Sequence, residues 1–173
     1  MPSKKLAGKA RAIKLLLLDV DGVMTDGSII YDGRGNEIKS FYVRDGVAIK
    51  WLQAAGVEVA ILSGRKSRPL SIRAKELGVQ RVIQSQILKL PAFEQLLAET
   101  GLSPRETAFI GDDIYDLSVL KRVGFSACPA DAVPEVKKAV DYVCKAKGGR
   151  GAVRELAELI LKAQRKLGGL RKI

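Results

Sequence analysis

The residues best suited to chemistry in this chain are Asp19 and Asp21, two carboxylates one residue apart that directly follow a largely apolar run. That run, residues 13–18, has the length of a buried strand in a parallel sheet. Gly22 then lets the backbone turn sharply and approach a ligand closely. Asp is also common in turns, but a turn needs only one Asp-Gly pair. We therefore favour chemistry at the carboxyl edge of a sheet, where open α/β sheets bind ligands.

Two more predicted core strands, residues 57–62 and 107–110, also end in polar clusters. These clusters are Ser63-Gly64-Arg65 and Gly111-Asp112-Asp113 with Asp116 close behind. Parallel strands end at one edge of a sheet, so all three clusters should converge. Carboxylates so close together repel, and one would hold a proton unless a cation intervenes. An all-oxygen site selects a hard cation, Mg²⁺ first.

The chain contains no histidine. This excludes Ser-His-Asp and Cys-His catalysis and also His-ligated zinc. Any chemistry must therefore use carboxylates, hydroxyls, lysine and arginine.

The length of 173 residues, with 47% hydrophobic and 28% charged residues, predicts a single soluble globular domain. The longest apolar runs are strand-sized, which predicts no membrane span. The amino terminus is basic without the apolar stretch of a signal peptide, so we expect a cytoplasmic protein. Cys128 and Cys144 lack paired spacing and are expected to be reduced core residues.

The formal net charge of +11 is concentrated at the two ends of the chain. Residues 1–18 carry five Lys or Arg and no acids, and residues 145–173 carry nine against two. Residues 19–144 hold sixteen basic and seventeen acidic side chains. Terminal basic residues are usually solvated and attract polyanions only weakly. We therefore expect a basic tail at 1–10, another at the carboxyl end, and no specific nucleic-acid partner.

Short apolar strands alternate with helices along the chain. Residues 28–31 and 37–43 predict a hairpin around the loop 32–36, and Asp45 is expected to cap a helix that ends at Gly56. Further helices are expected at 67–77, after Lys89 up to Gly101, at 134–139 and at 152–166, and further strands at 81–84, 125–128 and 142–144. This order predicts an α/β fold, a doubly wound, mostly parallel Rossmann-like sheet with helices on both faces.

The motifs together resemble a known superfamily. Asp19-x-Asp21-Gly22-x-x-Thr25, Ser63-Gly64-Arg65, Lys89 and Gly111-Asp112-Asp113-x-x-Asp116 are similar to the four motifs of the haloacid dehalogenase-like phosphatases. Within it, Val43-Arg44-Asp45-Gly46, Gln84 with Lys89-Leu90, Ala92-Phe93 and the run from Gly148 to Glu155 resemble the 3-deoxy-D-manno-octulosonate 8-phosphate (KDO 8-phosphate) phosphatases. The likeness spans residues 14–164 or so, and Ser85 departs from it where the family usually has Gly.

The resemblance implies a role for each motif residue. Asp19 would be the nucleophile that forms an aspartyl-phosphate, and Asp21 the general acid and then base. Mg²⁺ would be held by the Asp19 side chain, the Asp21 backbone carbonyl and Asp112, supported by Asp113 and Asp116. Ser63, Gly64 and Lys89 would bind the phosphoryl oxygens. Taken alone, Ser63 could merely cap a strand and Lys89 could be a solvated helix start.

The sequence has no room for the cap domain that covers the site in many enzymes of this superfamily. The insertion 27–45 fits only a hairpin, and residues 65–89 fit one helix and one strand. The hairpin carries more apolar side chains than a lone ribbon can bury, namely Ile29, Ile30, Tyr31, Phe41 and Tyr42. We expect it to pair with its own copies, and the resemblance implies a homotetramer whose neighbouring subunits complete each site.

Four residues are candidates for contact with the substrate beyond its phosphate: Thr25, Arg44, Arg65 and Arg150. Arg150 lies between glycines at 148, 149 and 151, which suits a mobile flap reaching for an anion. The same segment could equally be a flexible joint with Arg150 in solvent. Arg44 and Arg65 are candidates to meet the carboxylate of a sugar acid.

The resemblance implies a Mg²⁺-dependent phosphomonoesterase that converts KDO 8-phosphate to the free sugar acid and phosphate, in lipopolysaccharide precursor synthesis. A second hypothesis shares the chemistry but takes nine-carbon 2-keto sugar acid 9-phosphates of the sialic acid type. A third is a non-catalytic polyanion-binding protein that uses the basic ends.

Overall fold

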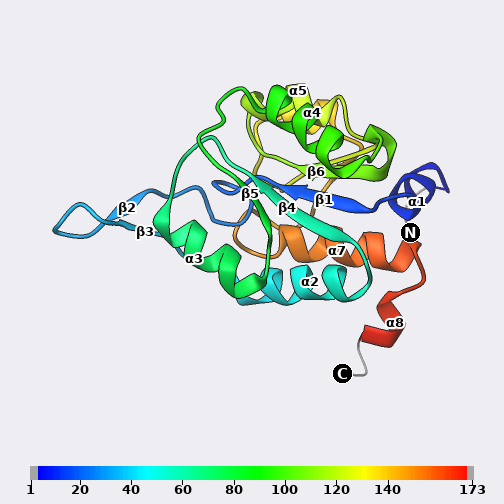
Figure 1. The fold of residues 1–173 in the computed structure, drawn as a ribbon, viewed down its shortest axis with the longest axis horizontal. Helices are drawn as coiled ribbons and strands as arrows, with labels where there is room; N and C mark the ends of the chain where they lie inside the picture. The colour runs from blue at the N-terminus through cyan, green and yellow to red at the C-terminus, as the bar shows by residue number, and fades with distance from the viewer. Residues whose placement is uncertain (1–3, 171–173) are drawn as a thin grey trace.

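A six-stranded parallel sheet forms the centre of the protein in a computed structural model, of which we describe residues 4–170 (Figure 1). Its strands are β1 (Leu15–Leu18), β4 (Glu58–Leu62), β5 (Arg81–Ile83), β6 (Thr107–Ile110), β7 (Phe125–Cys128) and β8 (Tyr142–Val143). Their order is β5-β4-β1-β6-β7-β8, and every neighbouring pair is parallel. The prediction of a doubly wound α/β fold is confirmed.

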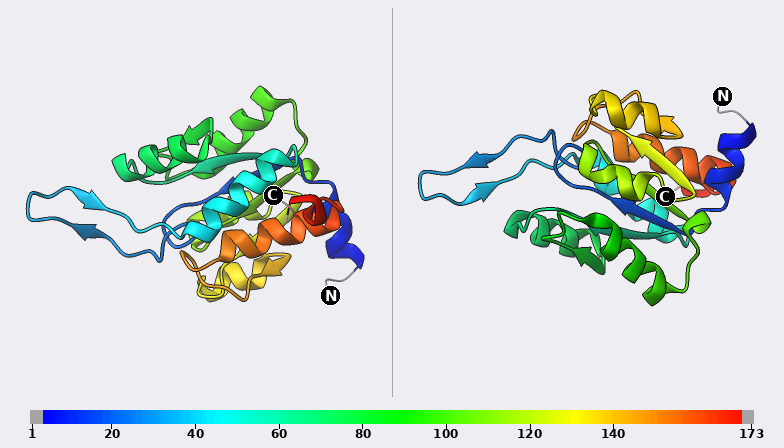
Figure 2. Two further views of the ribbon diagram at one scale, coloured as in Figure 1. Left: turned by 90° about the horizontal axis from the view of Figure 1, so that it is seen from below. Right: turned by 90° about the horizontal axis from the view of Figure 1, so that it is seen from above.

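Helices cover both faces of the sheet (Figures 1 and 2). One side carries α2 (Val43–Ala54), α3 (Arg68–Leu77) and α7 (Ala152–Ala163), and the other α4 (Lys89–Thr100), α5 (Leu117–Leu120) and α6 (Pro134–Ala139). The leucines of β1 alternate, with Leu16 and Leu18 in the first layer's core and Leu15 and Leu17 in the second's. All four are fully buried, as an uninterrupted apolar strand predicts.

The order of the strands brings the predicted polar clusters together. After β1 the chain builds β4 and β5 on one side and then returns to place β6 on the other side of β1. Leu18 pairs with Ile61 of β4 and with Ile110 of β6, so three strands end at nearly the same level. Such a reversal of strand order opens a crevice at the carboxyl edge.

The hairpin projects from this edge as a separate ribbon (Figure 2). Its strands β2 (Ile30–Tyr31) and β3 (Glu37–Ile38) have two residues each, so the longer strands predicted at 28–31 and 37–43 are wrong in extent. A two-stranded ribbon without a third strand is only marginally stable, so long regular pairing is not favoured. Asp32 closes the tip by accepting hydrogen bonds from the backbone N–H groups of Arg34 and Asn36.

The expected role of Asp45 as the cap of the following helix is wrong. Helix α2 begins two residues earlier, at Val43, without a side-chain cap. Asp45 is instead buried within its first turn, where Oδ1 accepts a hydrogen bond from the backbone N–H of Arg154 at 2.7 Å. The carboxylate thus serves the amino terminus of α7, a segment 109 residues away.

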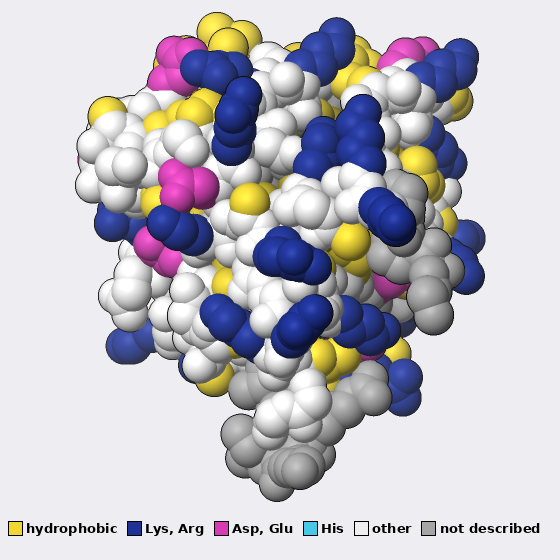
Figure 3. All heavy atoms as spheres, turned by 90° about the vertical axis from the view of Figure 1, so that its right-hand side faces the viewer, with side chains coloured by type: hydrophobic (Ala, Val, Ile, Leu, Met, Phe, Trp, Pro, Cys, Tyr) yellow, Lys and Arg dark blue, Asp and Glu magenta, His cyan; other side chains and the backbone are white. Residues whose placement is uncertain are grey.

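The two predicted basic tails are partly helical. Residues Lys4–Arg11 form α1, which packs on α7 and is fixed by an ion pair of Lys9 with Asp141 at 2.6 Å. After α7 a short helix α8 (Leu167–Leu170) follows, and residues 171–173 lie outside the described part. Figure 3 shows Lys and Arg spread over this end of the molecule, away from the hairpin.

The helix predicted at 67–77 is confirmed as α3. Ser67 caps it by accepting from the Leu70 N–H, and Gly78 ends it in the left-handed conformation. Ser103 and Glu106 form a capping box around the single turn η1 (Pro104–Glu106). Cys128 and Cys144 are free and buried. Within residues 4–170, the helices are too short or too polar to cross a membrane.

Asp45 predicts a specific pH dependence of stability. Burial raises its pKa to about 6, although the N–H groups of Arg154 and Gly151 and the Arg154 charge oppose this. A carboxyl with a raised folded-state pKa stabilises the protein below its unfolded-state pKa, and that stability is lost as pH rises through 6. We expect Asp45→Asn to weaken the pH dependence of the free energy of unfolding between pH 4 and 7. The decrease in this free energy across that range should become smaller by at most about 3 kcal/mol. Urea unfolding in chelator measures this, and equal slopes in both proteins would contradict it.

Candidate active site

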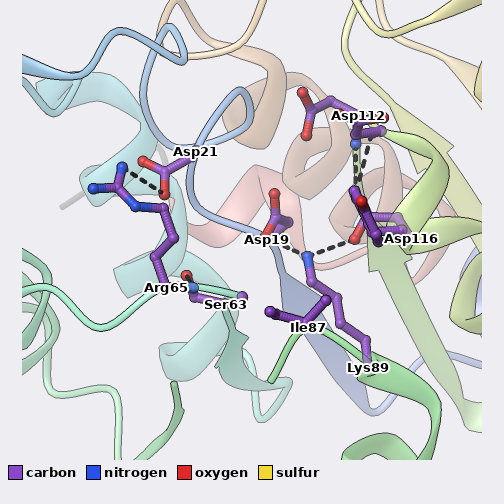
Figure 4. A pocket seen from close by; sticks show the side chains of 11 residues that line it. Asp19, Asp21, Ser63, Arg65, Ile87, Lys89, Asp112 and Asp116 are labelled. Carbon is purple, nitrogen blue, oxygen red and sulfur yellow. Dashed lines mark hydrogen bonds and ion pairs between the residues drawn. The ribbon is translucent and has the colours of Figure 1, made fainter. Parts of the chain in front are cut away.

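A pocket of about 410 Å³ lies at the carboxyl edge of the sheet (Figure 4). It brings together nearly all the residues that the motifs singled out. Its lining consists of Asp19, Asp21, Ser63, Gly64, Arg65, Ile87, Lys89, Asp112, Asp113, Tyr115 and Asp116. Residues from four separate segments of the chain thus meet in one site, as the predicted convergence of strand ends requires.

A buried lysine joins two buried carboxylates at the centre of the pocket. Nζ of Lys89 lies 2.6 Å from Oδ1 of Asp19 and 2.5 Å from Oδ1 of Asp116. Lys89 is the first residue of α4 and is 5% exposed, so it is neither a solvated helix start nor a surface charge. The two carboxylates raise the pKa of Lys89 despite its burial, which keeps the ammonium charged.

The carboxylates outnumber this cation. One oxygen each of Asp19, Asp112 and Asp116 lies within 4.8 Å of the others. Burial and the Asp116 charge raise the pKa of Asp19 well above its usual value, against the effect of Lys89. The same two causes raise the pKa of Asp112 to about 6. A divalent cation would relieve this repulsion, and the donor set, all carboxylate oxygens, suits a hard metal ion.

Asp116 has both carboxylate oxygens engaged by the protein. Oδ1 accepts from Lys89, and Oδ2 accepts from the backbone N–H of Asp112 at 3.0 Å. Asp113 stands further out, exposed, and caps the turn η2 (Ile114–Asp116) through the Ile114 N–H. Asp112 therefore has the freer carboxylate for an added cation, while Asp116 fixes the loop that presents it.

The loop after β1 is packed between two other loops at Gly22. A side chain there would place Cβ 2.1 Å from Oδ2 of Asp112, and one at Gly148 would place Cβ 1.8 Å from the Gly22 carbonyl oxygen. The Gly149 N–H also donates to the Val23 carbonyl at 2.9 Å. These glycines of the 148–151 segment thus permit close packing on the loop after β1, whereas the sequence predicted either a mobile flap or a flexible joint.

Ser63 and the residues after it line the opposite wall of the pocket. Ser63 is 2% exposed, and its Oγ accepts from the Arg65 N–H at 3.3 Å. Its carbonyl accepts from the Gln86 N–H at 3.1 Å. Ser85, just before Gln86, has a φ of 62°, a conformation that glycine adopts without strain. Ser in place of Gly therefore keeps the loop's path at some cost in backbone strain.

Three candidate substrate contacts lie outside the pocket lining. Thr25 is buried, and its hydroxyl donates to the Val20 carbonyl and accepts from the Gly27 N–H, which shapes the loop after β1. Arg44 is exposed, with its guanidinium 5.9 Å from the Tyr42 ring. Arg150 is exposed as well. Of the four candidates, the structure places only Arg65 in the site.

Sequence reasoning missed two charged residues of the hairpin base. Lys39 forms an ion pair with Asp21, and Glu37 forms one with Arg65 at 2.8 Å. The two-residue period of a strand could have indicated them, because it puts the side chains of Glu37 and Lys39 on one side and that of Ile38 on the other. The family motifs do not include these positions. Two exposed apolar residues of the rim, Ile87 and Tyr115, were missed too.

Comparison with known proteins identifies the family. A sequence model described as haloacid dehalogenase-like hydrolase matches residues 71–156. The chain is 47% identical over 161 residues to the 3-deoxy-D-manno-octulosonate 8-phosphate phosphatase KdsC of Yersinia pestis, covering 93% of this chain and 86% of the relative. It belongs to this phosphatase family. KdsC of Escherichia coli K12 is 44% identical over 165 residues, which cover 95% of this chain and 88% of that protein.

Solved structures of the family have the same fold. The KDO 8-phosphate phosphatase of Moraxella catarrhalis, crystallised with a magnesium ion, a phosphate ion and a KDO molecule, has a TM-score of 0.95 at 40% identity. That match covers 97% of each chain. The Yersinia pestis enzyme has a TM-score of 0.94 at 45% identity over 96% of this chain and 90% of that one. The family resemblance noted from the motifs is confirmed.

The carboxylate excess predicts opposite effects of Asp112→Asn with and without metal. Removing the buried charge should raise the free energy of unfolding of metal-free protein by about 1–2 kcal/mol at pH 7.5. The stabilisation that added Mg²⁺ gives the unaltered chain should be lost in the variant. Thermal unfolding in EDTA and in a Mg²⁺ series measures both effects.

Glu99→Gln, a surface carboxylate of α4, provides the matched control and should respond to Mg²⁺ as the unaltered chain does. A normal Mg²⁺ response of Asp112→Asn, or a loss of stability in EDTA, would contradict the prediction.

Proposed function

We propose that this protein hydrolyses 3-deoxy-D-manno-octulosonate 8-phosphate to the sugar acid and inorganic phosphate. The observation that carries this is the convergence of Asp19, Lys89 and Asp112 in a pocket of a chain that is 44–47% identical to curated phosphatases of that specificity. The Moraxella catarrhalis relative binds magnesium, phosphate and KDO in its crystal. We place the reaction in lipopolysaccharide precursor synthesis and in the cytoplasm, in a single hydrolase domain with a hairpin insertion.

The chain's own residues can perform both halves of the reaction. A carboxylate oxygen of Asp19 attacks phosphorus while the bond from phosphorus to the sugar oxygen breaks, and Asp21 gives that oxygen its proton. Asp21, now a carboxylate, then takes a proton from water as the water oxygen attacks the aspartyl-phosphate. The bond between phosphorus and Asp19 breaks, phosphate leaves, and Asp21 holds the proton taken from water, as at the start of the reaction.

The phosphoryl group is held by donors fixed before it arrives. Ser63, Gly64 and Lys89 line the wall where its oxygens would lie, and donors already in place stabilise the transition state without reorganisation. Lys89 also holds Asp19 in one orientation through their 2.6 Å contact. A nucleophile constrained in this way loses little freedom during attack.

The buried carboxylates fit a Mg²⁺ ion. We assign its ligands to the Asp19 side chain, the Asp21 backbone carbonyl and Asp112, with Asp113 and Asp116 supporting them. When bound, Mg²⁺ neutralises phosphoryl charge and lowers the repulsion that an anionic nucleophile meets. The raised pKa of Asp112 reflects the same excess of negative charge that the cation would balance.

The sugar acid is expected to contact arginines at the open side of the pocket. Arg65 lines that pocket and can meet a carboxylate. Arg44 and Arg150 are exposed outside the lining, so we assign them to the substrate of a neighbouring subunit in an oligomer. Thr25 would act only by shaping the loop after β1.

We infer a homotetramer held together by the hairpin. Ile29, Ile30 and Tyr31 are about half exposed, as is Ile38 on the opposite strand. A projecting ribbon with this much exposed apolar surface is typical of an interface. Copies of the same ribbon can cover one another in a closed assembly.

Activity on defined substrates tests the proposed function. We expect the protein to release phosphate from KDO 8-phosphate with Mg²⁺ and to lose this activity in EDTA. Asp19→Asn should lower turnover by at least about 10⁴-fold while remaining folded, because the nucleophile is lost. A higher kcat/KM on nine-carbon 2-keto sugar acid 9-phosphates would instead support the sialic acid type. Equal cleavage in chelator would contradict the proposal.

The oligomer is tested by the double variant Ile30→Ser, Ile38→Ser. Loss of apolar surface at the hairpin should lower the mass in sedimentation from that of four 18.7 kDa chains. Ile72→Ser removes an equally exposed isoleucine from α3 and should leave the mass unchanged. An unaltered mass for the hairpin variant would rule out this interface.

A further inference from the structure

Lys39 is a buried lysine that the reaction as described does not use. It follows β3 at the base of the hairpin, and its side chain is only 1% exposed. Lysines are seldom buried unless they are paired. Here the ammonium pairs with Oδ1 of Asp21 and lies 3.4 Å from Oε1 of Glu37. Its partner is thus the carboxyl group that must reach the leaving oxygen.

A second cation completes a four-membered charge network. Arg65 reaches Oε1 of Glu37 with Nη2 at 2.8 Å, and its Nη1 lies 3.9 Å from Oδ2 of Asp21. Burial raises the pKa of Glu37, but Ser67, Lys39 and Arg65 outweigh it and bring that pKa below the usual value. Glu37 is therefore a lasting negative charge between the two cations. Both oxygens of Asp21 face cations that Glu37 holds in place.

The geometry points to Lys39 as a positioning residue for Asp21, an inference that rests on the proposed function. Asp21 lies beside Arg65 on one side of the pocket, with Asp112 and Asp116 on the other and Asp19 between them (Figure 4). An in-line displacement needs its acid on the side from which the leaving oxygen departs. Lys39 and Glu37 hold the carboxyl group of Asp21 on that side, and neither of them exchanges a proton with substrate.

The arrangement makes the hairpin part of the catalytic apparatus of its own chain. Lys39 and Glu37 come from the insertion, whereas Asp21 and Arg65 follow β1 and β4. Asp21 is 24% exposed at its side chain and sits on a loop, so without a partner it would populate several rotamers. The side chain of Lys39 is buried directly after β3 and, through its ion pair, restricts the Asp21 carboxyl group.

Comparing substrates with different leaving groups tests whether Lys39 positions the acid Asp21 or only stabilises the hairpin. A sugar alkoxide needs a proton as it departs, whereas 4-nitrophenolate departs without one. We expect Lys39→Met to lower kcat/KM on KDO 8-phosphate by about 10–100-fold, within the range for general acid catalysis. On 4-nitrophenyl phosphate the same variant should lose less than about 3-fold, because no proton is needed there.

A double-mutant cycle tests whether Lys39 acts through Asp21. In an Asp21→Asn background, Lys39→Met should change kcat/KM by less than about 2-fold, since the acid is already absent. Lys39→Arg keeps the charge and should recover much of the activity. Arg34→Met removes a cation from the exposed tip of the same hairpin and should leave both substrates unaffected. If Lys39→Met does not yield folded protein, Glu37→Gln can be compared on the same two substrates. The difference between its losses of kcat/KM on the two should have the same direction and be smaller.

The outcomes are distinguishable from those of the proposed function. Failure of the unaltered chain to hydrolyse KDO 8-phosphate would overturn the proposed function. Normal hydrolysis by that chain, with equal losses on both substrates in the Lys39 variant or additive losses in the cycle, would overturn the role of Lys39 alone. Sedimentation of each variant shows whether the assembly has changed. A difference between the two substrates that appears only in variants of altered mass would also count against the role of Lys39.

Discussion

The site depends on one electrostatic constraint, an excess of buried carboxylates around a single lysine. Lys89 neutralises part of the charge of Asp19 and Asp116 from within hydrogen-bond distance, and Asp112 lies close by without an ion pair to any residue in the described range 4–170. Charges taken out of water are stable only when they are compensated. The fold therefore holds Asp19 within a cluster of excess negative charge, and that excess is the basis for binding a metal ion.

The parallel sheet makes this concentration of charge possible. Asp19 follows β1 and Asp112 follows β6, two strands whose residues are completely buried. The apolar core therefore fixes the position of the backbone that carries each carboxylate. Gly22 then allows Asp112 to come so close to the loop after β1 that a methyl group would not fit. The stability of two apolar layers thus offsets the cost of assembling like charges at their edge.

We propose two roles for the hairpin in the same chain. It exposes isoleucines and a tyrosine, from which we infer an interface between copies. Its base buries Lys39 and brings Glu37 to Arg65, beside Asp21. An enzyme without a cap domain must orient its acid by other means, and a buried lysine at the end of a ribbon can do so. In our proposals, assembly and chemistry are linked through this one short insertion.

The sequence by itself determined the elements and most of the site. Apolar runs of strand length, glycines at helix ends and the Asp-x-Asp-Gly and Gly-Asp-Asp motifs predicted β1, β6, α3 and the convergence of Asp19 with Asp112, because these depend on local patterns and on the rule that parallel strands end together. Tertiary structure decided what distant segments do to one another. Asp45 caps α7 across 109 residues of chain, Gly148 packs on Gly22, and Lys39 reaches Asp21. Such contacts follow from packing in three dimensions, and the spacing of residues along the sequence does not predict them.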